Sequence, residues 1–164
     1  MINQLLFALM LLTTLGTGLM AGLFFAFSIS VMKALGRLSP AEGIAAMQSI
    51  NIAIINPPFL LVFLGTAAGC VLVTIVSLLR WHDPGSVYLL AGAALYLVGG
   101  FLVTMVFNVP RNNALASVAP AGPNSAGLWA GYLSSWTAWN HVRTVAALVA
   151  AALLTIGLCI RSVH

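Results

Sequence analysis

The sequence has 164 residues, of which 62% are apolar and only 5% are charged, with six Lys or Arg, two Asp or Glu and a net charge of +4. Ordinary soluble domains carry about 25% charged residues, so this composition excludes a soluble globular enzyme, a disordered chain and a nucleic-acid-binding domain. The basic residues stand singly, without a run or stripe, so we expect membrane lipid and no nucleic acid among the partners. We predict one integral membrane domain over residues 1–164.

Four apolar segments are long enough to cross a bilayer, and they lie at about residues 5–32, 57–79, 87–107 and 142–161. A crossing needs roughly 20 residues, and the last segment can extend a helix that begins before it. In lipid the backbone must be paired within each segment, and the alternating pattern of strands is absent, so helices are predicted. The predicted fold class is all-α, a four-transmembrane-helix bundle whose uncharged first segment is a retained span and not a signal peptide.

The connection between the first two spans contains a helix start. Ser39 is a typical N-cap, Pro40 suits the first helical position, and Glu42 completes a capping box. These residues predict an extra short helix over about 40–55.

The connection between the third and fourth spans has two parts. Its first part, from Asn108, is rich in Ala, Pro, Gly and Asn, and we expect it to be irregular. Residues 125–140 lack proline and have aromatic residues at helical spacing, which predicts an interfacial helix leading into the fourth span. The second connection, residues 80–85, is a tight polar turn.

Two glycine pairs inside the spans have the GxxxG spacing that lets helix backbones approach closely: Gly18 with Gly22, and Gly65 with Gly69. Packing within one chain explains this spacing. A homodimer formed through one of these faces is the alternative.

Polar side chains concentrate at one end of the predicted bundle. With four spans the first and third connections lie on the same side of the membrane, and most of the chain's amides belong to them. Amide and guanidinium groups at the membrane boundary need partners, so we predict a convergent polar pocket there. Its candidate residues are Gln48, Asn51, Asn56, Asn108, Arg111, Asn112, Trp136, Trp139, Asn140, His141 and Arg143. The alternative interpretation is that these residues cap helices, satisfy loop backbone, set the topology or form an aromatic belt.

The residue stock limits the chemistry of such a pocket. His82, His141 and His164 are far apart in sequence, and Glu42 and Asp83 are the two acidic residues, so neither a metal site nor another cofactor site is predicted. No nucleophile motif, P-loop or dinucleotide fingerprint occurs. What remains is His141 as a candidate acid or base beside Arg143 and several amides. Such a set can deprotonate a carbon acid and stabilise the oxyanion that results.

Several motifs resemble the anthrone-oxygenase-like family of small four-helix membrane proteins. They are GLFFAFS at residues 22–28, MQSIN at 47–51, NPPF at 56–59, NVPRNNAL at 108–115 and WTAWNHVRT at 136–144. The resemblance implies an oxygenase that oxidises an anthrone, or another small hydrophobic aromatic substrate, with O2 and without a classical redox cofactor.

The resemblance also implies roles for the residues of the polar end. His141 would be the base that forms an enolate, and Arg143, Asn140 or Asn112 would hold the enolate oxygen. Substrate-binding positions are then Gln48, Asn51, Asn56, Asn108, Arg111, Trp136 and Trp139.

Two other functions stay open from the sequence: a non-enzymatic small-molecule or lipid-binding or transport-related protein, and a structural accessory subunit. The expected location is a bacterial inner membrane. Loops one and three carry Lys33, Arg37, Arg111 and Arg143 against Arg80 and Arg161 on the other side, which places the N- and C-termini outside.

Overall fold

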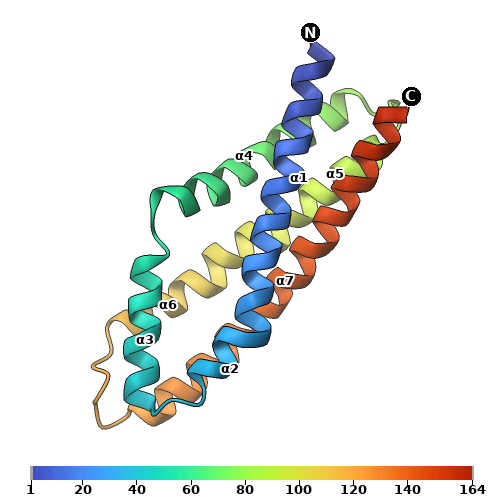
Figure 1. The fold of residues 1–164 in the computed structure, drawn as a ribbon. Helices are drawn as coiled ribbons and strands as arrows, with labels where there is room; N and C mark the ends of the chain where they lie inside the picture. Colours follow the sequence, from blue (N-terminus) through green and yellow to red (C-terminus); the bar gives the residue numbers. More distant parts are fainter. Residues whose placement is uncertain (1, 164) are drawn as a thin grey trace.

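A computed structural model gives the fold of residues 2–163 (Figure 1). These residues form helices and connections, and no strand occurs among them. The elements in chain order are α1 (Ile2–Ala26), the π-helical segment η1 (Phe27–Val31), α2 (Met32–Leu35), α3 (Pro40–Ala53), α4 (Pro57–Leu79), α5 (Ser86–Leu95), the π-helical segments η2 (Tyr96–Leu102) and η3 (Thr104–Asn108), α6 (Val109–Ala116) and α7 (Ser125–Val163).

Four helical stretches are long and apolar enough to cross a membrane: Ile2–Leu35, Pro57–Leu79, Ser86–Ala116 and Ser125–Val163. The first joins α1, η1 and α2, and the third joins α5, η2, η3 and α6. The predicted all-α bundle with four membrane-length helices and an extra short helix is therefore confirmed, and the chain has the make-up of a multi-pass membrane protein.

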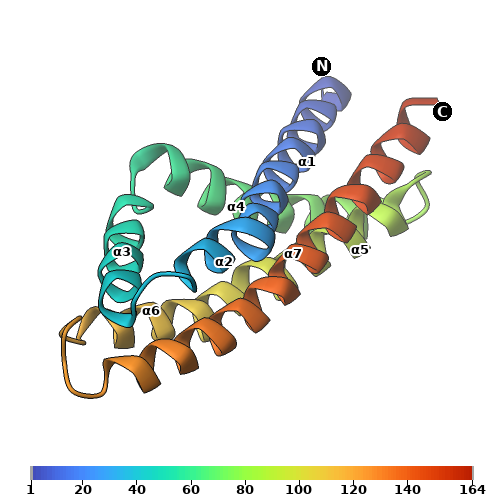
Figure 2. The same cartoon turned by 60° about the horizontal axis from the view of Figure 1, so that its bottom comes forward.

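The bundle is organised around α7, which packs against α1 and α5, while α4 packs against α1 and α5 as well. Figures 1 and 2 show the two ends of the chain at one end of the bundle, and α3, α6 and the connection after α6 at the other. The middle of the bundle is filled by an apolar cluster that includes Met10, Met20, Phe24, Phe63, Cys70, Val73, Leu89, Tyr96 and Leu154.

The predicted start of the short helix is confirmed at α3. Ser39 is its N-cap, and the capping box with Glu42 is complete. Ser39 Oγ accepts from the Glu42 N–H at 3.4 Å, and Glu42 Oε2 accepts from the Ser39 N–H at 3.1 Å. These bonds satisfy backbone donors that have no partner inside the helix.

The N-terminal half of α7 lies beyond the apolar bundle. A helix of 39 residues is about 58 Å long at 1.5 Å per residue, against about 30 Å of hydrocarbon in a bilayer. The predicted interfacial helix and the fourth span are thus one continuous element. Its first half packs with α2, α3 and α6 around a second apolar cluster that contains Met32, Leu35, Ile44, Met47, Leu115, Trp129, Tyr132 and Trp136.

The start of the third connection differs from the expected irregular segment. Residues 109–116 are the helix α6, which continues the third membrane-length stretch directly through Pro110. Proline removes one helical N–H and crowds the preceding turn. Here Pro110 stands at the beginning of α6, next to the π-helical segment η3, where the ordinary hydrogen-bond ladder is already interrupted.

The glycines divide between packed and open positions. A Cβ at Gly16 would collide with Thr66 of α4, and one at Gly69 would collide with Thr13 of α1, so these glycines permit the close approach of α1 and α4. A Cβ at Gly18, Gly22 or Gly65 would meet nothing. The packing within the chain therefore uses only one residue of the two GxxxG pairs, Gly69.

Candidate functional site

The centre of the polar end is Asn140, which is fully buried on α7. Its Nδ2 donates to the Phe24 carbonyl at 2.8 Å and to Ser28 Oγ at 2.7 Å, both in the first membrane-length helix. Its Oδ1 accepts a 2.6 Å bond from Arg143 Nη2, one turn along α7. A single amide therefore ties α7 to the first helix and orients the guanidinium.

Two hydroxyls extend this arrangement. Ser28 Oγ and Thr144 Oγ1 lie 3.0 Å apart, and Thr144 Oγ1 donates to the Asn140 carbonyl at 2.8 Å. Because the Thr144 proton is used there, Ser28 is the donor in the bond between the two hydroxyls. We call Ser28, Thr104, Asn140, Arg143 and Thr144 the Arg143 network.

Arg143 is only 5% exposed and carries the charge of the network. Its Nη1 donates to Thr104 Oγ1 at 3.1 Å, and its Cζ lies 4.4 Å from the ring centroid of Phe24 and 5.1 Å from that of Trp136. The aromatic faces offer the cation a favourable quadrupole. Arg143 Nε is buried and has no hydrogen-bond partner in the part of the chain that the structure describes.

Neither acidic side chain of the sequence neutralises Arg143. Glu42 bonds to Ser39 at the start of α3, and Asp83 bonds to Arg161 at the opposite end of the bundle. Moving a charge out of water without a counterion costs free energy. The uncompensated positive charge of Arg143 therefore favours an anion nearby. The arrangement is therefore suited to stabilising negative charge that develops next to the network.

Asn112 holds a second, smaller set of bonds between α6 and α7. Its Oδ1 accepts from Trp136 Nε1 at 2.7 Å and from Tyr132 OH at 2.9 Å. The ring face of Trp136 also packs against the Arg143 guanidinium. The bonds to Asn112 therefore fix the ring against which the guanidinium lies.

Three of the predicted substrate-binding amides bond to backbone. Gln48 Nε2 donates to the carbonyls of Leu115 and Val118, each at 2.9 Å, and Asn108 Nδ2 donates to the Trp136 carbonyl at 3.2 Å. Asn56 caps α4, because its Oδ1 accepts from Phe59 N at 2.9 Å. These bonds explain Gln48 and Asn56 without a ligand, whereas Asn108 Oδ1 is buried and has no hydrogen-bond partner among residues 2–163.

The other predicted substrate-binding residues lie around the same end. Asn51 Nδ2 is buried without a partner. Arg111 Nη1 donates to the Phe107 carbonyl at 2.6 Å, and the Trp139 ring stacks on the Phe107 ring with centroids 3.5 Å apart. None of the three hydrogen-bonds to Arg143 or Asn140 within residues 2–163.

His141 lies on a different face of α7 from Asn140 and Arg143 and is exposed. It lines a groove of about 560 Å³ between α7 and the end of the first membrane-length helix. We call this the His141 groove, and its lining residues are Ser28, Ile29, Met32, Lys33, Leu133, Ser134, Thr137, Ala138 and His141. Its volume falls in the range of about 300–1,000 Å³ that is typical of small-molecule sites.

Ser28 connects the groove with the buried network. Its hydroxyl lines the groove and is bonded to Asn140, which in turn bonds Arg143. The structure thus brings Asn140, Arg143, Trp136 and Asn112 together, and links His141 to them only through the groove.

The described residues contain no group of three His, Cys, Asp or Glu side chains close enough to hold a metal ion. His82 lies exposed in the turn between α4 and α5, at the other end of the bundle, and His164 lies outside the described residues.

The sequence interpretation missed Ser28, Thr104 and Thr144. The available signal was the presence of hydroxyl side chains inside apolar spans, where such groups seek partners on neighbouring helices. Ser28 and Thr104 also lie in the π-helical segments η1 and η3. Wide helical turns of this kind are frequent at functional sites, but nothing in the sequence pattern predicted them.

The chain matches a known protein family. A model of the family described as anthrone oxygenase matches residues 59–153, more than half of the chain. The matched segment contains Asn108, Arg111, Asn112, Trp136, Trp139, Asn140, His141 and Arg143, and it leaves out Ser28 and the α3 amides. Neither the curated proteins nor the solved structures gave a match.

Proposed function

The chain belongs to the anthrone oxygenase family, and from that premise we propose that it is a membrane-embedded oxygenase that uses O2 to oxidise a small hydrophobic aromatic carbon acid in the His141 groove. One observation carries the proposal. The groove combines a basic side chain, His141, with the Ser28 hydroxyl, and this hydroxyl belongs to a network that holds a buried cation without a counterion.

His141 supplies the base. The neutral imidazole accepts a proton from the acidic carbon of the substrate, and the substrate becomes an enolate. Ile29, Met32 and Leu133 form the apolar part of the groove and fit the hydrocarbon body of an aromatic ring system.

The enolate oxygen lies towards Ser28 in this proposal. Ser28 turns its proton from Thr144 to the oxygen, while Asn140 continues to donate to Ser28 Oγ. The charge of Arg143 behind Asn140 favours the anion, and Lys33 at the groove adds a second positive charge. Arg143, Asn140 and Asn112 are therefore positioning residues in this scheme.

The electron-rich enolate then reacts with O2. For an anthrone-type methylene the overall change is CH2 plus O2 to C=O plus H2O, which balances without a further reductant. No step of the proposed reaction passes through a metal or an organic cofactor.

The test is turnover of an anthrone by purified protein under O2, compared with spontaneous oxidation. His141→Ala should lower the catalysed rate by about 10²–10⁴-fold, the usual contribution of a positioned base. His82→Ala is the matched control and should leave the rate unchanged, because His82 is exposed in the turn between α4 and α5. Equal rates for His141→Ala and the unmodified protein would refute the proposal.

Non-enzymatic binding is the alternative outcome of the same experiment. Saturable binding of the anthrone that Ser28→Ala weakens, without oxidation above the spontaneous rate, would identify a carrier or sensor. A transport path receives less support, because the apolar cluster around Met10, Phe63 and Leu154 fills the middle of the bundle.

We further propose that the protein lies in a bacterial inner membrane with both termini outside. Both ends of the chain lie at one end of the bundle (Figure 1), where Arg80 and Arg161 share Asp83, and the exposed Lys33 and Arg37 lie at the other end, where retention of basic residues in the cytoplasm would hold them. A C-terminal reporter that is active only in the periplasm should be active. A C-terminal fluorescent fusion that glows only in the cytosol would reverse the orientation.

A further inference from the structure

A second concentration of charge lies at the opposite end of the bundle from Arg143. Arg161 Nη2, near the end of α7, donates to Asp83 Oδ2 at 2.8 Å, and Arg80 Nη1 lies 3.7 Å from the same oxygen. Two guanidinium groups therefore share a single carboxylate, and the cluster keeps one positive charge in excess.

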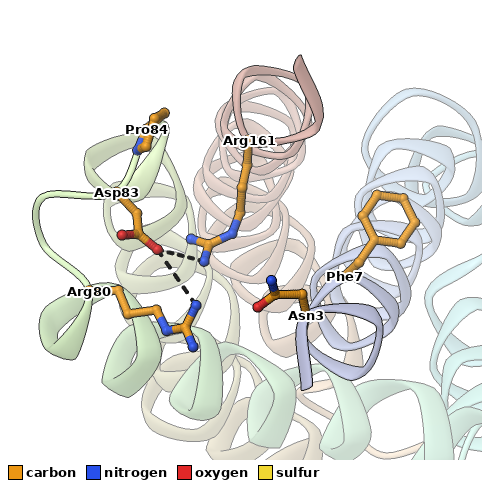
Figure 3. A pocket seen from close by; sticks show the side chains of 6 residues that line it. All are labelled: Asn3, Phe7, Arg80, Asp83, Pro84 and Arg161. Carbon is orange, nitrogen blue, oxygen red and sulfur yellow. Dashed lines mark hydrogen bonds and ion pairs between the residues drawn. The ribbon is translucent and has the colours of Figure 1, made fainter. Parts of the chain in front are cut away.

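A cavity of about 330 Å³ adjoins this cluster. Its lining is Asn3 and Phe7 of α1, Arg80, Asp83 and Pro84 of the turn region, and Arg161 of α7. Figure 3 shows the Arg161 guanidinium between Asp83 on one side and Asn3 on the other, with Phe7 beyond Asn3. Three segments that are distant in sequence thus surround one space.

The cluster has donor capacity that the protein does not use. Arg161 Nη1 is buried and has no hydrogen-bond partner among residues 2–163, although its neighbour Nη2 is bonded to Asp83. Asp83 holds both arginines near the same point but offsets only one of their charges. Planar guanidinium groups bind phosphate oxygens through paired N–H donors, so the vacant capacity suits such a group.

The position favours the phosphate of a lipid over a soluble one. The cluster lies where the apolar helices α4 and α7 end and α5 begins, at the level expected for headgroups. Trp81 beside it is 48% exposed, as aromatic residues at the membrane boundary are, and Phe7 is 46% exposed and provides apolar contact for the glycerol region. Basic side chains close to a membrane surface attract anionic lipid headgroups.

We propose that this cavity is a binding site for a phosphate group presented by an anionic phospholipid headgroup. Arg161 and Arg80 bind the phosphate oxygens, Asp83 keeps the two guanidinium groups in place, and Phe7 contacts the lipid below its headgroup. This site is independent of the oxygenase proposal and of the His141 groove.

The experiment is a lipid titration of the detergent-purified full chain, followed by native mass spectrometry. The three probes are phosphatidylglycerol, diacylglycerol with the same acyl chains, and inorganic phosphate. Phosphatidylglycerol should bind saturably with one site stronger than the rest, and diacylglycerol should not. Binding of inorganic phosphate as tight as that of the lipid, or equal binding of the two lipids, would overturn the headgroup assignment.

Variants locate the site. Arg80→Gln should weaken phosphatidylglycerol binding about fivefold while the bond between Arg161 and Asp83 remains, whereas Arg37→Gln, which removes an equal charge at the other end, should have no effect. Asp83→Asn is decisive, because it raises the excess charge of the cluster while the amide oxygen can still accept from Arg161 Nη2 and keep that guanidinium in place. An anion site then binds the lipid more tightly, while a cluster that only fastens the turn to α7 shows no gain, and that result would refute the proposal.

Discussion

Replacement of Asn140 by alanine tests whether the Arg143 network holds the bundle together. The variant loses two hydrogen bonds to the first membrane-length helix, at 2.8 and 2.7 Å, and leaves Arg143 Nη2 without its 2.6 Å acceptor. Hydrogen bonds between membrane helices are worth about 0.6 kcal/mol on average. A bond to a charged group is worth about 1.5–3 kcal/mol.

The expected loss is therefore about 3 kcal/mol in the free energy of unfolding, which changes the unfolding equilibrium more than a hundredfold. The assay is unfolding in mixed micelles of increasing SDS content, followed by far-ultraviolet circular dichroism. Asn113→Ala is the matched control, because this asparagine is exposed on α6 and should change stability by less than about 0.5 kcal/mol.

Asn140→Asp separates the contribution of the bond from Arg143 from that of the bonds to the first membrane-length helix. The carboxylate keeps an acceptor for Arg143, now as an ion pair, and loses the amide donor to both the Phe24 carbonyl and Ser28 Oγ, so its loss should be smaller than that of the alanine variant. If Asn140→Ala costs no more than Asn113→Ala, the buried amide does not join the helices in the way described.

Three further predictions probe other parts of the structure. Hydrogen bonds from the N-cap Ser39 lower the pKa of Glu42 below its usual 4.5. The ionised Glu42 therefore stabilises the fold above that pH, and this contribution is lost as the pH falls through the lower folded-state pKa. Glu42→Gln should flatten the acid limb of a pH-dependent unfolding curve, and an unchanged limb would contradict this. Gly16→Val should lower the unfolding midpoint because a side chain there collides with α4, whereas Gly18→Val should not, since a Cβ there meets nothing; equal midpoints would be inconsistent with the packing. Tyr132→Phe should cost about 1 kcal/mol, and Trp136→Phe should cost more because it also removes buried ring contact with Arg143. The double variant should cost more than the sum of the two, because only it leaves Asn112 Oδ1 without a donor; strict additivity in SDS titrations would argue against that sharing.

Much of the fold could be predicted from the sequence because its strongest signals are local. Uncharged apolar runs of membrane length define the four long helices, and the second of them begins and ends where predicted, at Pro57 and Leu79. The capping box at Ser39 likewise depends on residues three positions apart. Such signals do not require knowledge of the neighbouring helices.

Other features were inaccessible because they depend on packing. Pro110 suggested an irregular chain, whereas α6 continues through it after the π-helical segment η3. A wide helical turn reflects which hydrogen bonds the surroundings permit, and no residue pattern encodes it reliably.

The candidate site was predicted in part. The spacing of Asn140 and Arg143 placed them on one face, and the structure joins them by a hydrogen bond. His141 follows Asn140 directly, so its side chain points about 100° away around the helix, towards the groove. The partners on the first helix, Phe24 and Ser28, are more than 100 residues away in sequence, and their pairing with α7 follows only from the fold.

In the π-helical segment η1 the number of residues matters as much as their identity. A π-turn holds one residue more than an α-turn between the same two hydrogen-bonding levels. Deleting a single residue from 27–31 would therefore restore the regular ladder and leave the helix upstream in place, so the Phe24 carbonyl would still face Asn140. The loss would fall inside the segment, where Ser28 presents its hydroxyl to Asn140. Relatives that lack this extra residue should show a gap here in an alignment, together with a different hydroxyl partner for the asparagine on the last helix.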